Sequence, residues 1–261
     1  MLFDRKLYKI EILKLIKRKD IWVMVTMVGI PMLYSLGVYS NSSIIVYNGE
    51  NKEYAISFVT SMFHFVYMIF IYFFILSLST SKSLAGEIEN KSILLYSQRI
   101  NNRKKIYFQK NLSLISIFSV ICVVFYILSL AMFYLFAVKR VDIISNVFIV
   151  KEELLSVSCI FIAIYLYYIF TINLSLMMSS FMKQNATLIV YSIVFIVMIY
   201  LQNFPYIKYL SPSYYISSLS EIIPSNTLGI IQIIIPCIII HLVYVIIFNI
   251  IGIKKFEERD L

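Results

Sequence analysis

Long stretches without any charged side chain dominate the pattern of apolar and polar positions along this chain. Six stretches of at least 24 residues contain no Asp, Glu, Lys or Arg. They run 21–49, 54–81, 111–138, 154–182, 184–207 and 222–253. An α-helix needs roughly 20 apolar residues to cross a hydrocarbon core about 30 Å thick. The pattern therefore predicts six transmembrane helices.

The charged residues between these stretches favour one orientation in the membrane. Of the 23 Lys and Arg residues, 18 lie before residue 21, within 82–110, at 183 and after 253, which are alternate connecting segments. The other segments hold 5, namely Lys52, Lys139, Arg140, Lys151 and Lys208. By the positive-inside rule, both termini lie in the cytoplasm of a multi-pass plasma-membrane protein, with three loops outside.

Composition supports one all-α membrane domain over residues 1–261. The chain is 61% hydrophobic, has only 6 Gly and 5 Pro, and lacks the alternation of a membrane barrel. A basic cytoplasmic surface beside anionic lipid accounts for the net charge of +9, so no nucleic-acid partner is needed. Cys122, Cys159 and Cys237 all lie inside the apolar stretches, and their spacing predicts neither a disulfide framework nor a metal site.

The first 20 residues predict a helix at the cytoplasmic interface. They carry ten charged side chains, too many for the apolar centre of a signal peptide. Leu7, Ile10 and Leu13 share a broad apolar face, although lysines fall on it too. The alternative is a charged tail that only fixes the topology.

The longest predicted inside loop, residues 82–110, carries apolar side chains among its charges. Ile88, Ile93, Leu94 and Leu95 lie between acidic and basic residues, which is typical of a short helix that docks into a groove of another protein. In the alternative interpretation the loop is solvated and its basic cluster at 103–105 holds the topology.

The predicted outer segment, residues 203–227, contains a helix too short to cross the membrane. Ser211 and Pro212 favour a helix start, and Pro224 limits its end. Tyr215 and Leu219 lie on its apolar face. We expect this helix either to dip into the membrane and return, or to rest on the outer leaflet.

The sequence carries no enzyme motif: there is no phosphate-binding loop, nucleophile elbow or zinc-protease pair. His64 and His241 are the only ionisable groups of the six stretches, apart from Cys and Tyr, and no carboxylate accompanies them, which weighs against a proton or sodium relay. We expect Asn173, Ser175 and Asn249 to hydrogen-bond between helices. A path without charge suits an amphipathic or apolar cargo.

Two motifs resemble those of a known transporter family. Glu87-Ile88-Glu89, then Lys91-Ser92, Leu94-Leu95, Arg103 and Lys110, resemble the cytoplasmic motif of type-2 ATP-binding-cassette (ABC) exporter permeases. The chain departs from that motif with Lys91 in place of Gly, Ser92 in place of Thr and Ile100 in place of Pro. The ending Phe256-Glu257-Glu258-Arg259-Asp260 is similar to the Phe-x-x-Arg-Asp ending of these permeases.

The resemblance implies a six-span permease subunit without enzymatic activity of its own. A separate ATPase chain would carry ATP and Mg²⁺, and a second protomer, most simply an identical one, would complete a path for an amphipathic peptide such as a toxin or bacteriocin. The implied ATPase-coupling residues are Glu87, Glu89, Leu94, Leu95 and Arg103, and the implied external-gate residues are Pro212, Tyr215 and Leu219. The alternatives are a membrane receptor or anchor that transports nothing, and a sodium extruder subunit.

Overall fold

The computed structural model describes residues 3–40, 52–97, 100 and 102–259, and over these ranges the secondary structure is helical, with no β-strand. The α-helices are α1 (Arg5–Ile16), α2 (Lys19–Val25), α3 (Gly29–Tyr39), α4 (Ala55–Met68), α5 (Ile71–Ser81), α6 (Glu87–Glu89), α7 (Leu94–Ser97), α8 (Arg103–Leu135), α9 (Leu154–Ser179), α10 (Gln184–Leu201), α11 (Pro212–Glu221) and α12 (Thr227–Glu258). Shorter helical turns are η1 (Thr26–Val28), η2 (Lys82–Gly86), η3 (Ala137–Lys139) and η4 (Lys208–Leu210).

Several of these helices are long and apolar enough to cross a membrane. Among the described residues they are Lys19–Tyr39, Arg103–Lys139, Leu154–Ser179, Gln184–Leu201 and Thr227–Glu258. The stretch Ala55–Met68 and Ile71–Glu89 also qualifies as a pair, bent by 70° at the break. The number of possible spans is therefore five, or six if the bent pair is one span. The predicted all-α class and the apolar helices of a membrane protein are confirmed.

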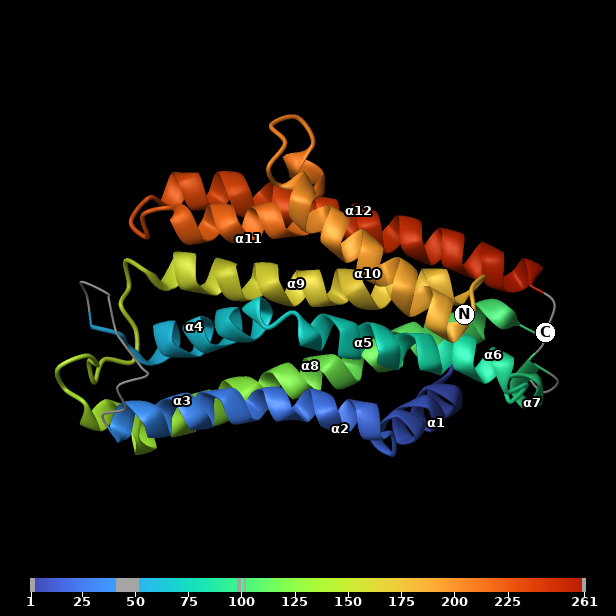
Figure 1. Ribbon diagram of the computed structural model, residues 1–261, viewed down its shortest axis with the longest axis horizontal. Helices are drawn as coiled ribbons and strands as arrows, with labels where there is room; N and C mark the ends of the chain where they lie inside the picture. Colours follow the sequence, from blue (N-terminus) through green and yellow to red (C-terminus); the bar gives the residue numbers. More distant parts are fainter. Residues whose placement is uncertain (1–2, 41–51, 98–99, 101, 260–261) are drawn as a thin grey trace.

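The helices form an elongated bundle with two distinct ends (Figure 1). One end, called here the terminal end, holds α1, α6, α7 and both chain termini. The opposite end, called the distal end, holds the end of α3 and the starts of α4, α9 and α12. In Figure 1 the helices α4 and α5 follow one another from the distal to the terminal end. The bent pair therefore runs through the bundle and does not turn back.

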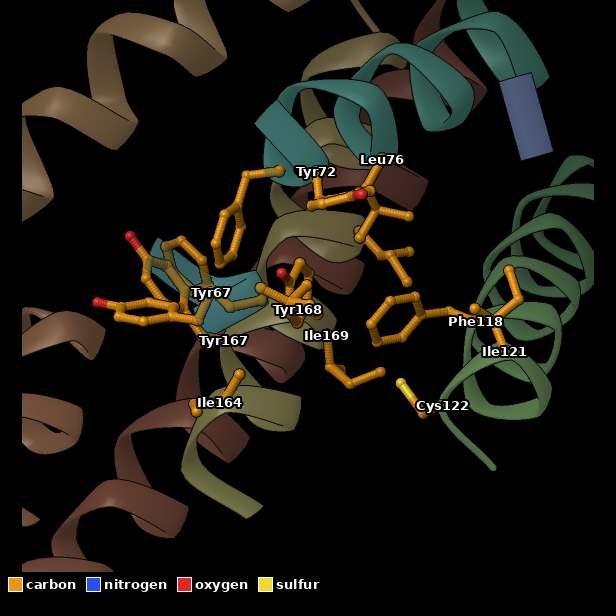
Figure 2. Packing of buried hydrophobic residues seen from close by; sticks show 14 of the residues in the cluster. Tyr67, Tyr72, Leu76, Phe118, Ile121, Cys122, Ile164, Tyr167, Tyr168 and Ile169 are labelled. Atoms are coloured by element: carbon orange, nitrogen blue, oxygen red, sulfur yellow. The ribbon is translucent and has the colours of Figure 1, made fainter. Parts of the chain in front are cut away.

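Helix α9 forms the centre of the bundle. In its most apolar stretch 61% of the residues are buried, compared with 22% in α12 and 17% in α10. Tyr168 on α9 stacks on Phe73 of α5 with ring centroids 4.3 Å apart, and it also lies 4.9 Å from Phe118 of α8. Figure 2 shows Tyr168 between the other helices and Phe118 of α8, with Tyr67 of α4 beside Tyr167 of α9. Such aromatic contacts are worth about 0.5–1.5 kcal/mol each beyond the area that they bury.

Helix α1 exists as predicted, but a different face of it is buried. The Asp4 side chain caps its start by accepting from the backbone N–H groups of residues 6 and 7. Leu7, Glu11 and Leu15 are buried at four-residue spacing, whereas Ile10 and Leu13 are 46% and 49% exposed. The face that packs against the bundle is thus centred on Glu11, whereas Ile10 and Leu13 of the predicted interfacial face remain exposed, and their contact with a membrane stays a prediction.

Candidate functional site

A cluster of four charged side chains, of which Glu11 and Lys110 are buried and Lys14 and Glu87 are partly exposed, ties three segments together at the terminal end. Lys110, at the start of α8, is fully buried and donates to Glu11 of α1 at 3.0 Å and to Glu87 of α6 at 2.8 Å. Lys14 of α1 donates to the other Glu87 oxygen at 2.8 Å and lies 3.5 Å from Glu11. Two acids and two bases make the cluster neutral. It fixes the predicted coupling loop, residues 82–110, between α1 and α8.

The electrostatics of Glu87 show that its charge belongs to this cluster. Burial alone would raise the pKa of Glu87, but the ammonium groups of Lys110 and Lys14 outweigh burial and hold this pKa below its ordinary value. Removal of one partner from a buried ion pair typically costs about 3–5 kcal/mol, because the other charge stays buried without compensation. Sequence reasoning missed Glu11 and Lys14. The signal that could have found Glu11 was its place midway between Leu7 and Leu15.

The other charged residues predicted for the coupling interface bind backbone groups of the chain itself. Glu89 accepts from the backbone N–H of Gln184 at the start of α10. The guanidinium of Arg103 donates to the carbonyls of Glu257 at 2.9 Å and Arg259 at 2.6 Å. The guanidinium of Arg259 in turn donates to the carbonyls of residues 179 and 182, at the end of α9. These bonds join α6 to the start of α10, and the start of α8 to the ends of α12 and α9.

The apolar residues of the same loop divide into an inner and an outer set. Ile93 is 1% exposed and packs into the core, whereas Leu95 is 69% exposed and Leu94 is intermediate. Leu95 also lines a groove of about 920 Å³ between the loop and α1. The groove is lined by Asp4, Lys6, Leu7, Ile10, Lys14, Lys17, Arg18, Glu87, Ser92, Leu95 and Ile100. Of the predicted apolar run, Leu95 is thus the side chain best placed to contact a partner.

The turn before α7 requires an unusual backbone conformation. Lys91 has φ 56°, the one positive φ of a non-glycine residue in the described part of the chain. A left-handed conformation of this kind costs a residue with a Cβ about 1–2 kcal/mol and suits glycine. The chain therefore makes a turn that favours glycine with a lysine at this position.

The bent pair α4–α5 contains a break near the middle of the charge-free stretch 54–81. Ile69 and Phe70 separate the two helices, and the described residues offer no hydrogen bond to the carbonyls of Tyr67 and Met68 or to the N–H groups of Phe70 and Ile71. In a hydrocarbon environment such groups are tolerated where protein buries them or where they line a water-filled cavity.

A second interruption separates α10 from α11. The connecting segment, residues 202–211 and called here the flank loop, projects sideways from the bundle at mid-length (Figure 1). The hydroxyl of Tyr244, near the middle of α12, donates to the carbonyl of Leu210 at 2.7 Å. The flank loop exposes Phe204, Tyr206, Ile207, Tyr209 and Leu210, of which Tyr206 is 93% exposed.

The predicted external-gate residues lie on α11, but the path of this segment differs from the prediction. Pro212 stands at the start of the helix, while Ser211 donates its hydroxyl to the carbonyl of Met198 and does not cap it. Tyr215 and Leu219 are buried where α11 packs against α9 and α12. Helix α11 runs from mid-length to the distal end and does not dip in and return (Figure 1). It continues the direction in which α10 crosses the bundle.

Polar side chains inside the bundle bond between helices, as predicted. Asn111 of α8 donates to the side-chain oxygens of Asn173 on α9 at 2.9 Å and of Asn249 on α12 at 2.8 Å. Asn249 also donates to Asn173 at 2.8 Å. Ser175 donates to Ser77 of α5 at 2.8 Å. Among the described residues no group of three or more His, Cys, Asp or Glu side chains could hold a metal ion.

Comparisons with known proteins identify a family but no activity. No curated protein matches the chain. The sequence profile of a family described as "Protein of unknown function (DUF2705)" matches residues 22–261. Because this match covers far more than half of the chain, the protein belongs to the DUF2705 family.

Proposed function

We propose that this protein is the membrane-spanning subunit of an ATP-driven exporter of the type-2 ABC class. In this proposal α4 and α5 form one broken span, α10 and α11 together form another, and the chain crosses the plasma membrane six times. The 18 Lys and Arg residues of the segments at the terminal end support a cytoplasmic position for that end by the positive-inside rule. A separate ATPase binds there and carries ATP and Mg²⁺.

The ion cluster is the observation that carries the proposal. A loop that only connects two spans has no need for a partly buried ionic network of Glu11, Lys14, Glu87 and Lys110. A loop that transmits force needs such a network, because a push on the loop must move α1 and α8 together with it. Leu95, exposed beside the groove, supplies the contact with the ATPase.

The two interrupted helices support a transport path. They are the second and fifth of the proposed six spans, and so occupy the same place in each half of the chain. Paired discontinuous helices near the membrane midplane form the binding sites of many transporters, because unsatisfied backbone groups are tolerated beside a cavity. Ring contacts at 5.5 Å between Phe70 at the first break and Phe195 of α10 bring the first break beside the helix that precedes the second.

The flank loop supports a dimer of identical subunits. It carries non-helical backbone and Lys208 at the depth of mid-α12, where exposure to lipid would be costly. A second protomer facing it would cover the loop and enclose the path. The exposed rings and aliphatic side chains of the loop suit an amphipathic or hydrophobic cargo, and a toxin-like or bacteriocin-like peptide is the cargo that we propose.

Co-purification with an ATPase tests this function. The protein should be isolated from its native membrane with a chain that hydrolyses ATP, and the activity of that complex should respond to short amphipathic peptides. Leu95→Asp should release the ATPase, whereas Leu228→Asp, an exposed change at the distal start of α12, should retain it. A protein that carries no ATPase would be a receptor or anchor instead.

The sodium-extruder alternative makes a different prediction. ATP hydrolysis that depends on sodium and ignores peptides would favour it. Asn173 and Ser175, the first candidate ligands for sodium, already bond to neighbouring helices. Sodium binding would therefore have to break these bonds, and Asn173→Ala should then abolish the dependence on sodium. Under the peptide hypothesis the same variant should leave the response to peptides in place.

A further inference from the structure

An apolar groove lies between α1, α2 and α8, on a different face of α1 from the groove beside Leu95. Its volume is about 410 Å³, within the range of about 300–1,000 Å³ typical of ligand sites. It is lined by Tyr8, Ile12, Ile16, Ile21, Trp22, Val25, Val28, Ser116, Ile117, Val120, Ile121 and Val124. Neither the ion cluster nor the interrupted helices use this groove.

The polar atoms of the lining are already bonded to one another or to the backbone. The hydroxyl of Tyr8 donates to Ser116 at 2.8 Å, and Ser116 donates to the carbonyl of Leu112 at 2.8 Å. The indole N–H of Trp22 donates to the carbonyl of Ile16 at 2.9 Å. The groove therefore offers carbon surface, which selects a hydrocarbon chain over a ligand that needs hydrogen bonds.

The groove lies at the depth of one membrane leaflet and opens sideways. Its lining on α8 begins at Ser116, close after Lys110, where the charge-free stretch 111–138 starts. Val120 and Trp22 line it and are each 61% exposed, so the opening faces the surroundings of the bundle. In a membrane these surroundings are the acyl chains of the leaflet at the terminal end.

Three exposed cations lie on α1 and α2, two of the helices that form the groove. Arg5 and Lys9 are exposed on α1 and at helical spacing fall on or beside the face that carries Ile12, while Lys19 is exposed at the start of α2. The nearby acids are engaged elsewhere. Asp4 caps α1, Glu11 binds Lys110, and Asp20 binds Arg18. A phosphate group is the natural counter-ion for such cations.

We propose that the groove binds one acyl chain of an anionic phospholipid, with its phosphate beside Arg5, Lys9 and Lys19. The lipid site rests on the membrane location of the chain and not on ATP-driven transport. The lipid site and the exporter function can therefore fail independently of one another. A bound lipid would touch both α1 and α8, the helices that share the ion cluster. Phospholipid would thus hold α1 in the position that presents Glu11 and Lys14.

Photolabelling tests the acyl-chain site. The purified full-length protein in detergent micelles is illuminated with phosphatidylglycerol whose acyl chain carries a diazirine, and labelled residues are mapped by mass spectrometry. Labels should concentrate on Ile12, Ile16, Val120 and Val124. Val120→Trp should fill the groove and remove most of this labelling. Ile127→Trp, an equally exposed change about two turns along α8 and outside the groove, should preserve it.

Equal labelling in the two tryptophan variants, or labels spread evenly over all exposed apolar helices, would overturn the site. The head-group requirement is tested with phosphatidylcholine that carries the same diazirine chain, which should label the groove more weakly. Lys9→Gln and Lys19→Gln should each reduce the preference for phosphatidylglycerol about fivefold, since a cation near an anionic head group contributes about that factor. Identical labelling by the two lipids would contradict the role of the cations.

Discussion

The terminal end and the flank loop differ in which kind of side chain is buried and which is exposed. At the terminal end, Lys110 is buried between Glu11 and Glu87, and Arg259 bonds to backbone carbonyls at the end of α9. At the flank loop, apolar side chains are exposed and the helix is interrupted, with Tyr206 almost wholly outside the fold. The first region pairs its buried charges within the chain, whereas the second leaves apolar side chains exposed.

This difference separates a region that is held by contacts within the chain from a region whose exposed surface is available to a partner. A desolvated ionic network resists separation, because each charge loses both its partner and the water that would replace it. Exposed rings on an irregular loop gain free energy only when something covers them. We infer that stability is concentrated at the terminal end and assembly at the flank loop. The predictions below test this division.

The largest expected effect is the loss of the lysine at the centre of the cluster. Lys110→Ala leaves Glu11 and Glu87 buried without their shared partner, and it should lower the free energy of unfolding by about 3–5 kcal/mol. Lys104→Ala on the same helix is the control, since its bridge to Glu257 is exposed, and it should cost at most about 1 kcal/mol. Thermal unfolding of both detergent-purified variants measures the contrast, and equal losses would contradict it.

The second test places a charge on each kind of exposed surface. If another protomer or a watery cavity covers the flank loop, Tyr206→Lys should change stability in membranes by less than about 1 kcal/mol. Ile246→Lys, on an exposed face near the middle of α12, should cost about 2.5–3.5 kcal/mol because it meets hydrocarbon. Insertion and expression levels of the two variants, compared in the same membrane, measure this. A greater loss for Tyr206→Lys would show that lipid surrounds the loop.

Acidification should weaken the terminal end selectively. The folded chain holds the pKa of Glu87 below its ordinary value of 4.5, so the unfolded chain takes up the proton first. The stability that this carboxylate contributes is complete above that value and is lost as the pH falls through the lower folded pKa. Unfolding temperatures measured from neutral to acidic pH should therefore fall less steeply in Glu87→Gln than in Glu152→Gln, an exposed control. Parallel curves would contradict the role of Glu87.

The smallest expected effect is a gain in stability. Lys91→Gly relieves the left-handed conformation at φ 56° and should stabilise the protein by up to about 1 kcal/mol, after the larger backbone entropy of glycine in the unfolded chain is deducted. Lys255→Gly, at an exposed position inside α12, should instead cost about 1 kcal/mol. Chemical unfolding of the two variants decides whether the turn is strained.

The helices could be predicted from the sequence, because they depend on local composition. A charge-free stretch needs no knowledge of its neighbours to be read as an apolar helix, and 154–182 became α9 almost unchanged. The helix start at Pro212 followed from the same local reasoning. The break at Ile69 and Phe70 could not be foreseen, since neither glycine nor proline marks it and the surrounding packing selects it.

The candidate site was predictable only in part. Glu87, Arg103 and Lys110 stood out through a motif, but their partners lie far away in the sequence and came from the fold. Glu11 was hidden because a charge in an apolar stripe is normally read as an exposed position, and only Lys110, nearly a hundred residues later, makes its burial possible. Leu94 and Leu95 carry the same side chain, and nothing local reveals which of them faces outward.

The bonds made by Arg259 have a consequence for how the protein is made. This arginine is translated after all of the helices that it joins. Its guanidinium donates to the carbonyls of residues 179 and 182 at the end of α9, and its backbone carbonyl accepts from Arg103. A nascent chain that stops short of it leaves these polar groups open at the end of the bundle. Until Arg259 is in place, these bonds do not yet join the ends of α8, α9 and α12.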